Sequence, residues 1–140
     1  MTAFRQAAVL AIAAFLPAIG EAVYLRQQIS WQSPVADGDS ATIAQTQAWG
    51  TNVLWVDARP AEDFQREHIP RAVSLNEDRW DESLPAFLET WSPDKRVVVY
   101  CSSEGCGASR EVARRLRDEA GLKNVFVLTG GWESWLATKR

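Results

Sequence analysis

The sequence predicts an α/β fold, in which a parallel sheet carries helices on both faces and follows an N-terminal hydrophobic helix. Two observations support this fold. From about residue 41 onward, short apolar segments alternate with segments of helical character. The apolar segments are nearly continuous rather than alternating with polar residues, which is typical of strands covered on both faces. Strands that alternate with helices pair in parallel through crossover connections.

Individual elements have local signals at their ends. Ser40 and Ser109 each stand at the start of a predicted helix, where a serine side chain caps the first backbone N–H groups. Pro60 stands where proline favours the start of a helix, and Gly121 ends a helix with a left-handed residue. In chain order, the sequence predicts helix 41–49, strand 52–57, helix 61–67, strand 72–75, helix 84–90, strand 96–100, helix 109–120, strand 124–128 and helix 132–137, with turns at 93–94 and 130–131.

The N-terminal part of the chain is almost continuously apolar. Residues 7–25 read AAVLAIAAFLPAIGEAVYL, a run of about 19 residues, near the lower length that spans a bilayer. We expect residues 1–29 to be an uncleaved membrane anchor that places the folded domain on the extracytoplasmic side. The alternative is a cleaved signal segment, which would leave the domain secreted or periplasmic. Residues 30–40 contain turn formers and form a linker, and residues 41–140 form the folded domain.

Composition narrows the classes of function. The net charge of -3 gives no reason to expect a nucleic-acid partner. The arginines of the helix 109–120 are interspersed with acidic residues, which favours a solvated helix face over a basic binding patch. The chain has 2 cysteines and 1 histidine, too few for a usual zinc site, so we expect no metal and no cofactor.

The two cysteines lie in one loop, between a predicted strand and a predicted helix. The apolar run 97–100 ends directly at Cys101, and a loop of small residues leads to Ser109. Loop N–H groups and the positive end of the following helix favour negative charge at that place. A thiol held there loses its proton more easily, and the thiolate is the reactive form. The sequence therefore predicts an ionised, accessible sulfur nucleophile at residue 101.

The order of four short motifs resembles the rhodanese (sulfurtransferase) domain. Asp57-Ala58-Arg59 is similar to the family's Asp-x-Arg at the end of a central strand. The segment from Glu62 to Ala72, which contains Glu67-His68-Ile69-Pro70-Arg71-Ala72, is similar to the family's E-F-x-x-G-H-I-P-G-A. Tyr100-Cys101 matches the strand end and nucleophile, and Gly130-Gly131-Trp132 with Trp135 resembles the closing G-G-x-x-x-W. The resemblance covers about residues 41–137.

The resemblance implies a sulfurtransferase that carries sulfane sulfur as a cysteine persulfide. Cys101 would take sulfur from a donor and pass it to a thiol acceptor, each a small molecule or a protein. The loop would stabilise the anionic persulfide through its backbone. By this match the active-site loop consists of Ser102, Ser103, Glu104, Gly105, Cys106, Gly107, Ala108 and Ser109.

The loop departs from the family pattern in length and charge. It is about two residues longer than the common rhodanese loop and holds no arginine, because Arg110 comes only after the serine. Glu104 adds a carboxylate, which would oppose small anions by about 1 kcal/mol. We therefore expect poor thiosulfate turnover and a persulfide or thiol partner instead. Asp57, Arg59 and Arg110 are candidates for orienting the loop, although a structural ion pair between Asp57 and Arg59 is favoured.

Cys106 leaves two interpretations open. It is either a small loop residue without a task or a resolving cysteine that forms a disulfide with Cys101. Such a disulfide needs Cα atoms within about 7 Å of one another. The function alternatives are correspondingly a thiol–disulfide redox protein that uses both cysteines, or a non-catalytic docking module with this fold.

Overall fold

The protein folds around a parallel sheet of five strands. The computed structural model describes residues 37–103 and 106–140. The strand order is β1-β5-β4-β2-β3, and each neighbouring pair is parallel. The strands are β1 (Ser40–Ala41), β2 (Val53–Asp57), β3 (Val73–Ser74), β4 (Arg96–Tyr100) and β5 (Val125–Leu128).

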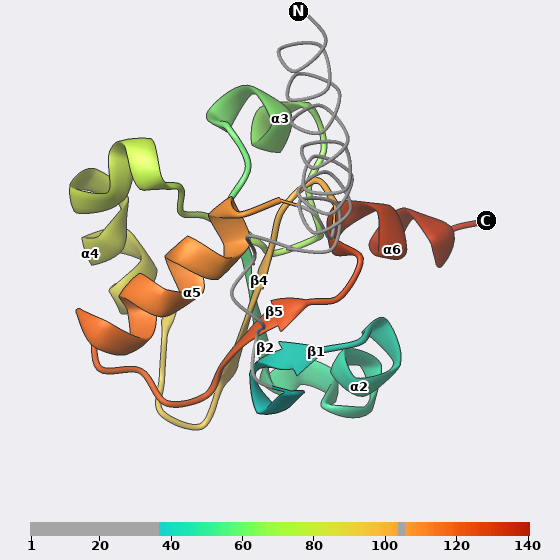
Figure 1. The fold of residues 1–140 in the computed structure, drawn as a ribbon, viewed down its shortest axis with the longest axis horizontal. Coiled ribbons are helices and arrows are strands. Elements are labelled where there is room, and N and C mark those ends of the chain that lie inside the picture. Colours follow the sequence, from blue (N-terminus) through green and yellow to red (C-terminus); the bar gives the residue numbers. More distant parts are fainter. Residues whose placement is uncertain (1–36, 104–105) are drawn as a thin grey trace, which may run out of the picture. The chain divides into compact units, whose positions relative to one another are not determined.

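Helices connect the strands and cover the sheet on both faces, as the sequence predicts. The sheet separates two core clusters, one on each face, because successive residues of a strand point to opposite sides. Val97 and Val99 of β4 pack with buried residues of α4 and α5, whereas Val98 and Tyr100 pack beside α2 and α6. Figure 1 shows α4 and α5 together on one side of the sheet. The helices are α2 (Ile43–Ala48), α3 (Ala61–Arg66), α4 (Trp80–Thr90), α5 (Ala108–Asp118) and α6 (Gly131–Ala137), with short 3-10 turns at Asp37–Asp39, Gly50–Asn52 and Glu77–Arg79.

The start of the domain differs from the prediction. Ser40 does not cap the first helix, since Ser40 and Ala41 pair with Val127 and Leu128 as the edge strand β1. Thr42 caps α2 instead. Its side chain accepts a hydrogen bond from the Gln45 amide, and the Gln45 side chain accepts one from the Thr42 amide in return.

Helix α4 begins four residues earlier than the sequence predicts. Its first residue, Trp80, is buried, and the Arg115 guanidinium of α5 lies 4.2 Å from the Trp80 ring centre. The first turn of α4 therefore packs against a neighbouring helix, and Pro85 lies inside α4.

The predicted membrane segment lies outside the described residues. The helices of residues 37–103 and 106–140 include no apolar helix that would reach across a bilayer.

Candidate active site around Cys101

The site lies at the carboxyl ends of the central strands. Strand β4 ends at Tyr100, so Cys101 is the first residue beyond it. Asp57, the last residue of β2, pairs with Tyr100, and the Ala58 amide donates a 2.9 Å hydrogen bond to the Tyr100 carbonyl. Ligands of parallel sheets bind at this edge. The sheet therefore places Cys101 where the sequence predicts it.

Cys101 and Cys106 are joined by a disulfide. Their Cα atoms are 6.1 Å apart, within the limit of about 7 Å that a disulfide allows. The Cys106 amide donates a 3.2 Å hydrogen bond to the Ser103 carbonyl, which folds the loop back on itself. Cys101 is 4% exposed, whereas Cys106 is half-buried. The expectation of an accessible sulfur at residue 101 is therefore wrong for this disulfide form, because the Cys101 side chain is bonded to its neighbour and buried.

Helix α5 begins at Ala108, two residues after Cys106. Gly107 is its N-cap residue, and the first backbone bond runs from the Glu111 amide to the Gly107 carbonyl at 3.0 Å. The prediction that Ser109 caps this helix is wrong. Ser109 lies inside the first turn and is buried, since the helix starts one residue earlier. The disulfide thus holds the Cys101 sulfur beside a helix N-terminus, whose N–H groups favour a thiolate.

The turn between β5 and α6 contacts the Cys101 backbone. Gly130 and Gly131 both have left-handed backbones, with φ of 75° and 55°. A Cβ atom added at Gly131 would lie 2.5 Å from the Cys101 carbonyl oxygen and 3.2 Å from the Ser103 nitrogen. The next amide, Trp132, donates a 2.7 Å hydrogen bond to the Cys101 carbonyl. The absence of a side chain at residue 131 therefore allows this turn to hold the start of the loop.

Asp57 and Arg59 form the ion pair that the sequence analysis favours. Arg59 Nη2 lies 2.7 Å from Asp57 Oδ2, and both side chains are buried. Burial is the largest single effect and opposes the charge of Arg59. Hydrogen bonds to Asp57 and the attraction of nearby negative groups, chiefly Asp57, together outweigh burial, so the pKa of Arg59 is raised. Arg59 also donates a 2.6 Å bond to the Glu67 carbonyl.

The same guanidinium reaches the aromatic residues around the loop. Its carbon atom lies 4.4 Å from the Trp132 ring centre and 5.6 Å from the Tyr100 ring centre. The Tyr100 and Trp132 rings are themselves stacked at 6.1 Å. The ion pair thus packs against both neighbours of Cys101. Tyr100 precedes Cys101 in the chain, and the Trp132 amide donates a hydrogen bond to the Cys101 carbonyl. Whether it also orients the loop for catalysis stays a prediction.

Burial governs the chemistry of Tyr100. Its side chain is fully buried, and its hydroxyl accepts a 3.2 Å hydrogen bond from the Ile69 amide. Burial is the main reason why the pKa of Tyr100 is raised above its usual value. The residue is therefore neutral and serves as a packing and hydrogen-bonding group.

The structure describes some of the remaining predicted site residues but not all of them. Arg110 is half-buried in the first turn of α5, so its proposed role at the loop stays a prediction. Glu104 and Gly105 lie outside the described residues. His68 donates a 2.8 Å hydrogen bond to the Phe64 carbonyl and stacks on the Phe64 ring, so these contacts hold the turn that follows α3.

The sequence pattern does not predict the Trp132 amide bond or the close approach of Gly131 to Cys101. Both belong to the Gly130-Gly131-Trp132 motif, which the sequence predicts as a turn followed by a helix. Two consecutive glycines before a helix were the available signal, because they mark a left-handed turn or a close backbone contact.

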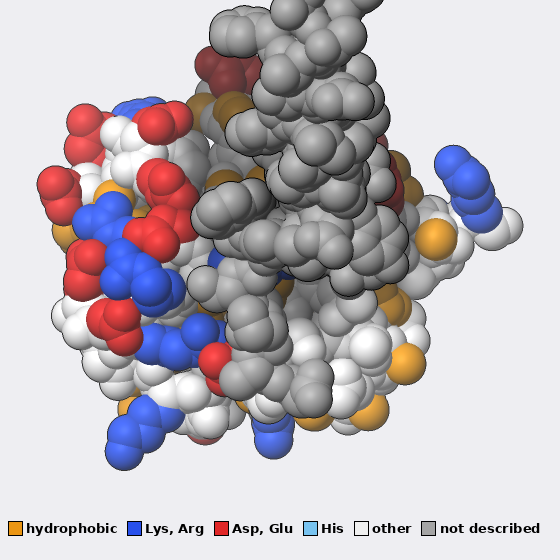
Figure 2. All heavy atoms as spheres, viewed as in Figure 1, with side chains coloured by type: hydrophobic (Ala, Val, Ile, Leu, Met, Phe, Trp, Pro, Cys, Tyr) orange, Lys and Arg blue, Asp and Glu red, His pale blue; other side chains and the backbone are white. Residues whose placement is uncertain are grey.

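The surface of α5 has the predicted mixed charge. Figure 2 shows acidic and basic side chains interleaved over α4 and α5. Arg114 pairs with Glu111 and Asp118, and Arg115 pairs with Glu119. Among the described residues, no cluster of three or more histidine, cysteine or acidic side chains is arranged to hold a metal.

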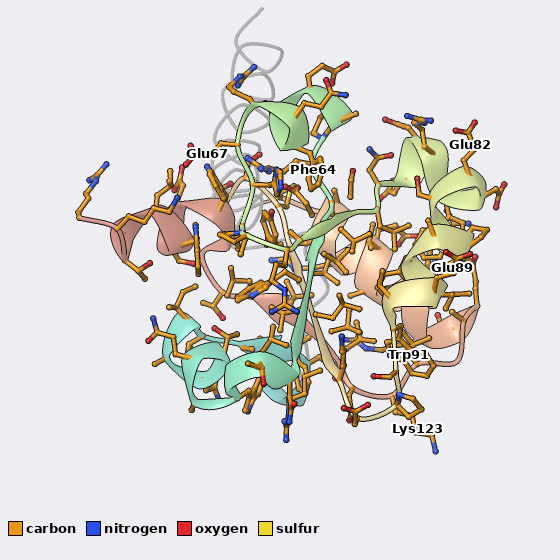
Figure 3. All side chains as sticks on the ribbon, turned by 180° about the vertical axis from the view of Figure 1, so that it is seen from behind. Phe64, Glu67, Glu82, Glu89, Trp91 and Lys123 are labelled. Atoms are coloured by element: carbon orange, nitrogen blue, oxygen red, sulfur yellow. A yellow bond between two sulfur atoms is a disulfide. The ribbon has the colours of Figure 1, made fainter. Side chains whose placement is uncertain are left out.

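A pocket of about 240 Å³ lies far from this site. It is bordered by Trp91, Lys95, Lys123 and neighbouring residues, at the amino ends of β4 and β5. Figure 3 shows Trp91 and Lys123 at the opposite end of the sheet from Phe64 and Glu67. Cys101 follows the carboxyl end of β4, whereas the pocket lies at its amino end. This pocket therefore takes no part in chemistry at Cys101.

Comparison with known proteins agrees with this geometry. The family model for the rhodanese-like domain matches residues 40–138. A thiosulfate sulfurtransferase GlpE of Coxiella burnetii is 31% identical over 99 residues, which cover 68% of this chain and 86% of that protein. A relative with the same name from Pseudomonas savastanoi is 35% identical over 83 residues, covering 59% of this chain and 72% of its own length.

A solved structure shares the fold. The crystal structure of a thiosulfate sulfurtransferase from Pseudomonas aeruginosa superimposes with a TM-score of 0.57 at 23% identity, over 72% of this chain and 18% of that chain. The match of the family model extends from β1 to the end of α6 and includes every strand of the sheet. The chain therefore belongs to the rhodanese-like domain family.

Proposed function

We propose that this protein is a sulfurtransferase that carries sulfane sulfur as a persulfide on Cys101. The observation that carries the proposal is the place of this sulfur, at the carboxyl end of β4 and bonded to the residue that precedes the α5 N-cap. Membership in the rhodanese-like family and relatives named thiosulfate sulfurtransferase support it.

The reaction begins from the reduced protein. The Cys101 thiolate attacks the sulfane sulfur of a donor, and the remainder of the donor leaves with the electron pair of the broken bond. The product is a persulfide anion, which the N–H groups at the start of α5 stabilise. An acceptor thiolate then attacks the terminal sulfur, and the Cys101 thiolate leaves. The donor we expect is a persulfide, since Glu104 adds negative charge to the loop.

Intact-protein mass spectrometry tests the proposal. The full chain is reduced, freed of reductant, and exposed separately to thiosulfate, glutathione persulfide and peroxide. The proposal predicts a gain of one sulfur atom with a sulfur donor. Cys101→Ser should not gain it, whereas Cys106→Ser should.

Two other outcomes would support the alternatives. Loss of two hydrogens with peroxide and no gain of sulfur from either donor would point to a thiol–disulfide redox protein. No change under any condition would point to a docking module. Cyanide-labile sulfur that persists in Cys101→Ser would refute the assignment of the nucleophile.

A further inference from the structure

We propose that Cys106 is a resolving cysteine that discharges the Cys101 persulfide as hydrogen sulfide. The inference rests on the proposed function, because it requires that Cys101 carries sulfur. It adds a second reactive residue and a product, since sulfur would leave as sulfide rather than pass intact to an acceptor thiol.

The loop geometry brings Cys101 and Cys106 together. The two cysteines are bonded at a Cα separation of 6.1 Å, although five positions separate them in sequence. Both ends of the loop are fixed to regular elements. Cys101 follows β4 directly, and its carbonyl is held by the Trp132 amide. Cys106 is followed by the N-cap of α5, and its own amide is bonded to Ser103. The two sulfurs therefore meet without rearrangement of the sheet or of α5, which gives their reaction a high effective concentration.

In the loaded protein, Cys101 Sγ is bonded to the terminal sulfur. Cys106 Sγ attacks Cys101 Sγ and forms the disulfide that the structure contains. The bond to the terminal sulfur breaks, and its electron pair leaves with that sulfur. The proton of the Cys106 thiol goes to the leaving group, so the product is hydrosulfide. The sulfane sulfur is reduced by two electrons, and the two cysteine sulfurs supply them.

The disulfide must be reduced before the site can accept sulfur again. An external dithiol must reduce the disulfide, and exposure decides which sulfur it attacks. Cys101 is 4% exposed, whereas Cys106 is half-buried and so is the more accessible of the two. Attack on Cys106 expels Cys101 as a thiolate beside the α5 N-terminus, which favours this leaving group. The second thiol of the reductant then releases Cys106, so that the dithiol is oxidised and both cysteines are reduced.

A single-turnover experiment tests the inference on the full chain. Reduced protein is freed of reductant under anaerobic conditions, loaded with one equivalent of glutathione persulfide, and followed by intact mass and by trapping of released sulfide. We expect wild type to release about one sulfide per chain and to lose two hydrogens. Cys106→Ser should keep one added sulfur and release less than about one tenth as much sulfide, and Cys101→Ser should do neither. The chain has only 2 cysteines, so no third thiol complicates the result.

The outcomes separate the two proposals. If Cys106→Ser loads sulfur but wild type keeps its added sulfur and releases no sulfide, the inference is wrong and the sulfurtransferase stands. Equal sulfide release by wild type and Cys106→Ser would also overturn it, because the released glutathione would then be the reductant. If neither protein loads sulfur, the proposed function itself fails. Cys106→Ala and a thermal melt of each variant exclude misfolding as the cause.

Discussion

The backbone amide of Trp132 donates a 2.7 Å hydrogen bond to the carbonyl oxygen of Cys101. This bond joins the first residue of the candidate active-site loop to the first turn of α6, about thirty residues later in the chain. It is formed because Gly131 has no side chain and adopts φ of 55°. In this chain the closing glycine motif therefore contacts the proposed nucleophile through the backbone.

Substitution of Gly131 should damage both the stability and the activity. In Gly131→Ala the new Cβ would lie 2.5 Å from the Cys101 carbonyl oxygen, so the loop or the turn must move. The left-handed backbone adds about 1–2 kcal/mol of strain, and we expect a total destabilisation of about 3 kcal/mol. Urea denaturation measures the stability, and the rate of sulfur loading measures the displacement of Cys101.

Gly121→Ala is the matched control. Gly121 also has a left-handed backbone, with φ of 72°, but a Cβ there would meet nothing within 4 Å. We expect a loss of about 1 kcal/mol and an unchanged loading rate. Similar loading rates in the two variants would show that the approach of Gly131 to Cys101 has no functional consequence.

The buried ion pair predicts strong coupling between Asp57 and Arg59. Arg59→Met leaves the Asp57 carboxylate buried without its guanidinium partner, and we expect a loss of about 3–5 kcal/mol. Asp57→Asn in the same chain removes the orphaned charge. The double variant should be more stable than the sum of the two single losses predicts, by about 1–3 kcal/mol. Additive losses in a double-mutant cycle would contradict this account of the pair.

Tyr100 predicts a loss of stability at alkaline pH. Its pKa in the folded protein is raised above the usual value of about 10, chiefly by burial. Below pH of about 10, Tyr100 keeps its phenolic proton in both the folded and the unfolded protein, so its contribution to the stability of the fold is fully present. Above it the unfolded chain loses the proton while the folded protein keeps it, and stability falls by about 1.4 kcal/mol per pH unit.

Tyr100→Phe isolates this effect. Without the hydroxyl, the Ile69 amide loses its acceptor, so the variant should be less stable at pH 9 by about 1–3 kcal/mol. The difference in free energy of unfolding between wild type and Tyr100→Phe should then narrow between pH 10 and pH 11, as measured by urea denaturation. A stability difference that stays constant with pH would contradict a raised pKa for Tyr100.

Arg71 occupies a backbone position that favours glycine. Its φ is 68°, and the Ala72 amide donates a 2.9 Å bond to the Ile69 carbonyl, which closes a turn with Pro70 and Arg71 at its centre. The family motif that this segment resembles has glycine at this position. Arg71→Gly should therefore stabilise the domain by about 1 kcal/mol, because it relieves left-handed strain.

Arg71→Ala separates strain from the loss of the side chain. Arg71 is exposed, and alanine keeps the strain that glycine relieves. We expect a thermal melting temperature close to wild type for Arg71→Ala and several degrees higher for Arg71→Gly. An equal rise in both would assign the effect to removal of the arginine side chain.

The apolar run at residues 7–25 predicts a membrane anchor. When the full chain is expressed in a bacterial host, we expect protein of the full-length mass in the membrane fraction. This protein should stay with the membranes after a carbonate wash. A cleaved signal would instead give a shortened protein in the periplasm. Leu16→Arg, which adds about 2.5–3.5 kcal/mol to insertion, should reduce the membrane-bound fraction. Full-length protein in the cytosol would contradict both interpretations.

Local sequence patterns determined the central part of this fold. The uniformly apolar runs at β2 and β4 identify strands buried on both faces, and the structure places them side by side in the middle of the sheet. Because a parallel sheet gathers its functional loops at the carboxyl ends of the strands, the position of Cys101 followed from the end of β4 alone.

The tertiary structure decided the contacts between distant segments. β1 is two residues long and exists through its pairing with β5, so its own sequence carries no strand signal. Ser109 is a plausible cap in sequence, but the start of α5 buries it inside the first turn. The Gly131 approach to Cys101 and the stacking of Arg59 on Trp132 likewise join residues that are far apart in the chain. Hydrophobic periodicity records which face of an element is buried, but it does not record which backbone or ring will lie against it.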